Sequence, residues 1–145
     1  MLVGQWGWKA QTLRRTLRKR NIRPWVHHLE GVTDRELPGI YRSAFMTLFP
    51  SHYEGFGLPI VESMKSGTPV IASSTSSIPE VAGDAALLVD PYNIQDMCDA
   101  IHGLIQSSTL RKTLSEKGKQ RAQIFTWDQT ARQTLEVLEQ SATRF

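Results

Sequence analysis

The sequence of 145 residues is poor in cysteine and contains no long hydrophobic run. Its single cysteine, Cys98, excludes an internal disulfide and any metal site built from several cysteines. We expect Cys98 to be a small, buried apolar residue on a helix. No apolar run approaches the roughly 20 residues that a membrane-spanning helix requires. The first residues also lack the charged and apolar regions of a secretory signal, so we expect none.

The composition is that of a globular protein with a small excess of positive charge. Hydrophobic residues make up 40% of the chain and charged residues 21%, which excludes an intrinsically disordered chain. Lysine and arginine total 17 against 14 aspartates and glutamates, for a net charge of +3. That excess favours anionic partners without identifying one. The length is usual for a single domain, which we expect over residues 1–145.

Short apolar segments alternate with helical patterns along the chain. The segments that resemble strands are residues 2–4, 24–29, 44–49, 70–72 and 86–89. Segment 44–49 is almost continuously apolar, which is typical of a strand buried on both faces of a parallel sheet. Helices are expected at residues 8–20, 33–41, 58–67 and 78–82 and throughout the last third. The alternation predicts an α/β fold with a doubly wound, Rossmann-like parallel sheet and a helical C-terminal third. Almost nothing of the first strand is present, so we expect the domain to be truncated at its N-terminus.

The loops after the strands are where such a sheet binds its ligands. They are Gly4–Gly7, Glu30–Asp34, Ser51–Leu58 and Ser73–Ser77. In the third loop, Gly55 and Gly57 remove side chains where the backbone must turn or be approached closely. The amides of residues 56–58 then lie at the start of a helix, where free N–H groups and the helix dipole suit a phosphate.

Two glutamates flank this expected phosphate site. Glu54 lies in the loop, and Glu62 lies about one turn into the helix. Carboxylates do not bind phosphate, but they accept hydrogen bonds from sugar hydroxyls, so the combination suggests a nucleotide sugar. The residues alone leave two interpretations open: a ligand site, and an ordinary surface turn with solvated carboxylates.

A dense basic cluster follows the first strand. It consists of Arg14, Arg15, Arg18, Lys19, Arg20 and Arg23. Two interpretations stay open, namely a solvated helix face and a surface for anionic lipid headgroups, worth about 1 kcal/mol per basic residue. We expect no nucleic-acid partner, because no interleaved aromatic platform accompanies the cluster.

The segment FPSHYEGFGLPIVESM, residues 49–64, resembles the donor-site signature of retaining glycosyltransferases. The family is family 4, the large "group 1" family with the GT-B fold. The resemblance continues, in order and spacing, through residues 31–37, 41–44, 67–72, 78–81 and 83–91. Essentially the whole chain is similar to the C-terminal, nucleotide-sugar-binding half of such an enzyme.

The resemblance implies a role for several residues. Glu54 matches the first glutamate of the family's paired-glutamate motif, which contacts the transferred sugar; we expect it to be the catalytic residue, acting by electrostatics and positioning rather than as a nucleophile. Glu62 matches the second glutamate, which holds the ribose hydroxyls. The other expected substrate-binding residues are Gly55, Phe56, Gly57 and Leu58 in the donor loop, and Gly31 and Val32 in the loop near the base.

The resemblance also implies the reaction and its partners. A hexose would pass from a GDP- or UDP-hexose to a glycan or lipid-linked acceptor, with no cofactor and no bound metal; the chain has no Asp-x-Asp pair. The family's acceptor-binding half and its diphosphate-clamping basic pair are absent from these residues. We therefore expect an N-terminal acceptor domain in cis or in trans, an isolated chain that is inactive, and a cytoplasmic location at or near the inner face of the membrane, in polysaccharide biosynthesis. The alternatives are a non-catalytic nucleotide- or sugar-binding module and a protein-interaction domain.

Overall fold

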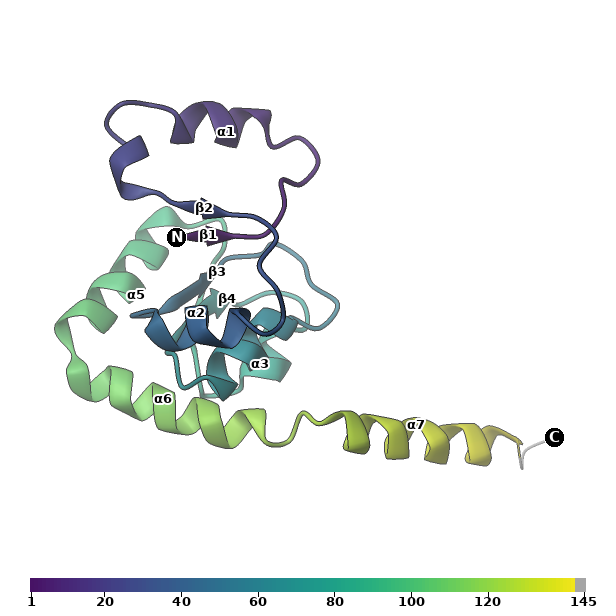
Figure 1. The fold of residues 1–145 in the computed structure, drawn as a ribbon. Coiled ribbons are helices and arrows are strands. Elements are labelled where there is room, and N and C mark those ends of the chain that lie inside the picture. Colours follow the sequence, from purple (N-terminus) through teal and green to yellow (C-terminus); the bar gives the residue numbers. More distant parts are fainter. Residues whose placement is uncertain (143–145) are drawn as a thin grey trace. The chain divides into compact units, whose positions relative to one another are not determined.

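The computed structural model describes residues 1–142 of the chain (Figure 1). These residues divide into two compact units, Met1–Leu37 and a larger one that begins at Pro38. All strand pairs are parallel, with a two-stranded sheet in the first unit and a three-stranded sheet in the second. The predicted α/β fold with parallel strands is confirmed.

The first unit consists of short elements around its two-stranded sheet. In chain order they are β1 (Leu2–Val3), α1 (Gln11–Leu17), the 3-10 helix η1 (Arg23–Trp25) and β2 (His28–Leu29). β1 and β2 pair in register, with Leu2 opposite His28 and Val3 opposite Leu29. No side chain of this unit is fully buried.

Two expected elements of the first unit are shorter than their patterns predict. The helix expected over residues 8–20 begins only at Gln11, because Lys9 has a left-handed backbone (φ 61°) that a helix does not accommodate. The strand expected over residues 24–29 is reduced to its last two residues. Pro24 instead lies in the first turn of η1, a position that suits its fixed φ and its missing N–H.

The second unit contains a sheet with helices on both faces. Its elements are α2 (Leu37–Ser43, which begins at the boundary), β3 (Thr47–Phe49), α3 (Leu58–Lys65), β4 (Val70–Ser73), α4 (Ile78–Ala82), β5 (Leu87–Val89), α5 (Ile94–Gln106), α6 (Ser108–Ala122) and α7 (Trp127–Ala142). The strand order is β3-β4-β5. Because side chains alternate along β4, Val70 and Ala72 pack in a core with α3 and α4, while Ile71 packs on the other face with Leu104 of α5. This two-sided packing is the doubly wound arrangement that the sequence predicts.

Burial on both faces belongs to β4 and not to β3. Every residue of β4 is buried, whereas Leu48 in the middle of β3 is 41% exposed. The prediction for segment 44–49 was therefore wrong in this respect. β3 is an edge strand of its sheet, and the covering helix α5 packs chiefly on β4 and β5.

The helical last third forms as its pattern predicts. Asn93 begins α5 by accepting hydrogen bonds from the amides of Gln95 and Asp96 at 3.0 and 3.2 Å. Cys98 is exposed, so the prediction that it is buried was wrong: α5 directs Leu104 into the core, and Cys98 lies off that face. The apolar side chains of α7 are also exposed, including Trp127 at 82%. None of the described helices is long and apolar enough to cross a membrane.

Candidate functional site: the donor loop after β3

We call residues 50–57 the donor loop; it connects the carboxyl end of β3 to α3. Gly57 ends it with a left-handed backbone (φ 97°), and a Cβ added there would lie 3.2 Å from Cδ1 of Ile60. Glycine is therefore required at this position for conformation and for space. Gly55 differs, because an added Cβ would meet nothing within 4 Å. Nothing among the residues that the structure describes demands a glycine there.

The start of α3 has the geometry of an anion site. No side chain caps the helix, and the second helical position is Pro59, which has no N–H. Among the described residues, the amides of Gly57 and Leu58 donate no hydrogen bond. They lie at the positive end of the helix dipole, so this helix start offers free donors to a negatively charged group.

Phe56 and Leu58 have partly exposed side chains, with exposed fractions of 40% and 52%. The rings of Phe56 and Phe125, which follows α6, meet edge to face with 5.5 Å between the ring centroids. This contact fixes the side chain of Phe56 against the helical third.

Glu54 is half-buried in the donor loop and held at several atoms. Its Oε1 accepts a hydrogen bond from Oγ of Ser51 at 2.8 Å. Its amide donates to Oγ of Ser76 at 3.0 Å, and its carbonyl accepts from Oγ of Ser77 at 2.8 Å. Oε2 has no partner among the described residues, so one carboxylate oxygen remains available to a ligand.

Glu62 is held by a tyrosine to which the sequence patterns assign no role. Tyr41 of α2 donates from its hydroxyl to Oε2 of Glu62 at 3.1 Å. Burial of the phenol raises the pKa of Tyr41 strongly, and the negative charge and hydrogen bond of Glu62 raise it further. Thr68 in turn donates to the carbonyl of Tyr41 at 2.6 Å. No local pattern signals the pair, because it joins elements that are far apart in the sequence.

Residues 73–77 comprise the last residue of β4 and the loop that leads to α4, and they lie against the donor loop; we call them the hydroxyl loop. Ser73 donates to the carbonyl of Ser51 at 2.6 Å, and Thr75 donates to the carbonyl of His52 at 3.0 Å. Two of the loops expected to bind ligand are thus in direct contact. Both lie at the carboxyl end of the three-stranded sheet, where parallel sheets bind ligands.

Gly31 and Val32 belong to the first unit and follow β2. Gly31 has a left-handed backbone (φ 71°) that turns the chain away from the strand. Just beyond them, Oε2 of Glu36 accepts from the amide and the hydroxyl of Thr33 at 2.9 and 2.8 Å. These hydrogen bonds lower the pKa of Glu36, so the carboxylate stays charged and the turn stays fixed.

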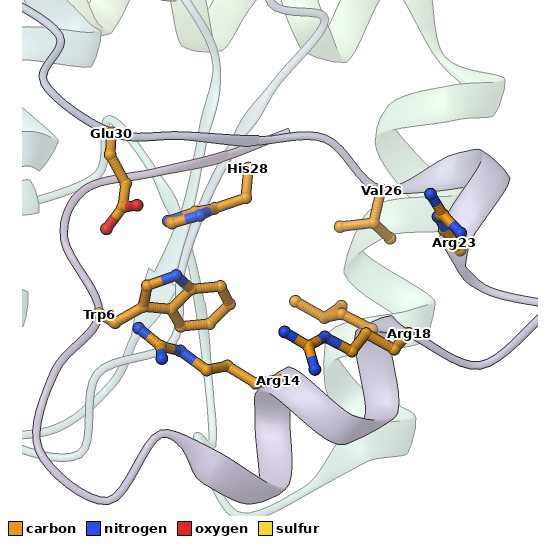
Figure 2. A pocket seen from close by; sticks show the side chains of 8 residues that line it. Trp6, Arg14, Arg18, Arg23, Val26, His28 and Glu30 are labelled. Atoms are coloured by element: carbon orange, nitrogen blue, oxygen red, sulfur yellow. The ribbon is translucent and has the colours of Figure 1, made fainter.

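The first unit also contains a cavity of about 290 Å³, shown in Figure 2. The Arg14 guanidinium lies over the Trp6 ring, 4.6 Å from its centroid, and His28 contacts the same ring at 4.2 Å. The other lining residues are Leu17, Arg18, Arg23, Val26 and Glu30. Half of the predicted basic cluster therefore lines this cavity, and the other half lies on the surface; all six side chains are exposed.

The described residues contain no group of three or more histidine, cysteine, aspartate or glutamate side chains placed to hold a metal ion. The expectation that no metal takes part in the reaction stays a prediction. The candidate site consists of the donor loop, the Tyr41–Glu62 pair and the four residues of the hydroxyl loop that bond to the donor loop, namely Ser73, Thr75, Ser76 and Ser77.

Comparison with known protein families identifies the family of this chain. The family described as "Glycosyl transferases group 1" matches residues 1–121. The chain belongs to this family. It is 36% identical over 135 residues to the O-antigen chain mannosyltransferase B of Escherichia coli; the match covers 93% of this chain and 35% of that protein. The chain thus spans about a third of the length of this curated relative.

Solved structures of glycosyltransferases share the fold. Sucrose-phosphate synthase from Thermosynechococcus elongatus is 27% identical with a TM-score of 0.83, and the match covers 93% of this chain and 35% of that one. HepE of Anabaena, solved in complex with UDP-glucose, is 23% identical with a TM-score of 0.85, over 96% of this chain and 40% of that one. The predicted membership of the group 1 family and the predicted GT-B half are confirmed.

Proposed function

We propose that this chain is the nucleotide-sugar-binding half of a retaining glycosyltransferase. The enzyme transfers a hexose from a GDP- or UDP-hexose to a glycan or lipid-linked acceptor. The observation that carries the proposal is the single segment in which free amides at the start of α3 lie between two half-buried glutamates. Each glutamate is fixed by a hydroxyl at one oxygen and has the other oxygen without a partner among the described residues.

Different residues bind different parts of the donor: amides bind its negatively charged diphosphate, and carboxylates bind its hydroxyl groups. The diphosphate lies at the amides of Gly57 and Leu58, where the helix dipole favours negative charge without a metal or other cofactor. Glu62, held by Tyr41, accepts hydrogen bonds from the ribose hydroxyls. Glu54 accepts from hydroxyls of the transferred sugar and stabilises the positive charge that develops on it during transfer. Gly31 and Val32 provide the loop near the base.

The remainder of the enzyme lies outside this chain in our proposal. The chain covers about a third of the length of the Escherichia coli mannosyltransferase to which it is similar. We propose that an acceptor-binding domain, joined in cis or supplied in trans, completes the site, and that the isolated chain binds donor without transferring it. We also propose a cytoplasmic location in polysaccharide biosynthesis, with the basic cluster facing an anionic membrane surface.

A titration of the purified chain with GDP-, UDP- and ADP-sugars tests the function. Calorimetry is expected to show binding of one nucleotide class, weakened by Glu62→Ala. If Glu62→Ala leaves binding unchanged, the donor does not bind at α3. Turnover of a nucleotide sugar by the isolated chain would contradict the proposed need for a second domain.

A further inference from the structure

We propose that the hydroxyl loop is the positioning device for Glu54, with Ser76 and Ser77 as its central groups. The inference rests on the proposed function, because it assigns Glu54 to the transferred sugar. It adds residues from a separate segment to the site, and these residues would act through Glu54 without touching the donor.

The hydroxyl loop and the donor loop are joined by four side-chain hydrogen bonds. They run from Ser73 to the carbonyl of Ser51 (2.6 Å), from Thr75 to the carbonyl of His52 (3.0 Å), from the amide of Glu54 to Ser76 (3.0 Å) and from Ser77 to the carbonyl of Glu54 (2.8 Å). Of the five hydroxyls in the loop, only that of Ser74 has no hydrogen-bond partner among the described residues. Such a set of contacts fixes the backbone of the donor loop up to Glu54.

At Glu54 the contacts restrain the direction of the side chain. Ser76 holds the amide and Ser77 holds the carbonyl, so the backbone is fixed on both sides of the Cα. Ser51, whose own carbonyl is held by Ser73, then fixes Oε1 of the carboxylate. The free oxygen, Oε2, is thereby aimed by residues that lie more than twenty positions further along the chain.

The hydroxyl loop is well suited to be a rigid support. It begins at Ser73 and is followed by Ile78, both with no exposed surface. Ser76 has a left-handed backbone (φ 54°), which is uncommon for a residue other than glycine and is maintained only when the surroundings fix it. A serine there supplies the acceptor for the Glu54 amide, which a glycine does not.

Affinities of the full chain for UDP-glucose and UDP, and for GDP-mannose and GDP, test the proposal. Because Glu54 contacts the sugar, the wild-type chain is expected to bind one nucleotide sugar more tightly than the matching nucleotide. Ser76→Ala and Ser77→Ala should reduce that sugar-dependent gain by roughly fivefold, as expected for one hydrogen bond, and leave the nucleotide affinity unchanged. Ser74→Ala is the matched control and should change neither. Ser76→Gly removes the same hydroxyl without backbone strain and should behave like Ser76→Ala.

Hydrogen exchange gives a second readout that needs no ligand. The Glu54 amide is expected to exchange faster in Ser76→Ala and Ser76→Gly than in Ser74→Ala, and unchanged exchange would refute the proposal. An equal loss of affinity for nucleotide and nucleotide sugar would also refute it, since it would show a merely structural role. If the wild-type chain binds none of the four ligands, the proposed function fails. If it binds but Glu54→Gln leaves the sugar-dependent gain intact, only the role of Glu54 and its support fails.

Discussion

Replacing Tyr41 by phenylalanine removes one hydroxyl and tests how Glu62 is held. That hydroxyl donates to Oε2 of Glu62 at 3.1 Å, and both side chains are half-buried. A hydrogen bond to a charged group contributes about 1.5–3 kcal/mol, and partial exposure favours the low end. We therefore expect Tyr41→Phe to lower the free energy of unfolding by about 1.5 kcal/mol and the Tm by roughly 5 °C.

The same variant should weaken nucleotide binding through the ribose alone. With Glu62 less fixed, affinity for UDP or GDP is expected to fall about fivefold, equivalent to about 1 kcal/mol. Affinity for the 2′,3′-dideoxy nucleotide should not change, because that ligand has no hydroxyl for Glu62. Calorimetric titration of both ligands with both proteins measures the difference. A loss of equal size for both ligands would refute the proposed role of Tyr41, as would no loss for either.

The pH dependence of stability provides an independent check on the pair. Burial and the charge of Glu62 raise the pKa of Tyr41 above the value of 10.0 that it has when unfolded. The stability that this shift represents is fully present below pH 10 and is lost as the pH rises toward the folded-state pKa, at about 1.4 kcal/mol per pH unit. Denaturant unfolding between pH 9 and 11 should show this decline in the wild type, and a smaller one in Tyr41→Phe. Parallel curves would show that the phenol is not linked to folding.

Further substitutions test the backbone, the core and the surface. Gly57→Ala should lower the free energy of unfolding by about 1–3 kcal/mol, because the backbone there has a φ of 97° and Ile60 lies close by. Gly55→Ala should leave that free energy unchanged, and similar stabilities of the two variants in thermal unfolding would contradict the geometry. Leu104 is fully buried on the face of α5 that packs against β4, so Leu104→Ala should lower the free energy of unfolding by about 2–5 kcal/mol. A loss below about 1 kcal/mol would contradict the described packing of Leu104. The chain should sediment with anionic liposomes at low salt and dissociate at high salt, and no sedimentation at low salt would exclude the membrane role of the basic cluster.

The parts of the fold that the sequence predicts well are those with local signals. Pro59 at the start of α3 and Gly67 after its end mark that helix, and the apolar segment of β4 marks its strand. In the first unit, Lys9 takes a left-handed backbone and Pro24 enters a 3-10 turn, so the elements are shorter than their patterns. Local periodicity contains no information about such departures.

The candidate site divides in the same way. Glu54 and Glu62 are found from the sequence, because the loop and helix start around them have a recognisable pattern. Tyr41 is not, since its hydrogen bond to Glu62 depends on the tertiary packing of α2 beside α3. The contacts of the hydroxyl loop likewise span 22 or 23 residues and exist only after β3 and β4 have paired.

The contact between the donor loop and the hydroxyl loop bears on how donor preference can be re-engineered. In a chimera that receives only residues 50–62 from a relative, the imported donor loop must bond to a hydroxyl loop from a different protein. Effects of mutations in the two loops should be non-additive, because the residues share hydrogen bonds. The donor loop and the hydroxyl loop should therefore be exchanged as a pair in grafting experiments and mutated together in directed evolution.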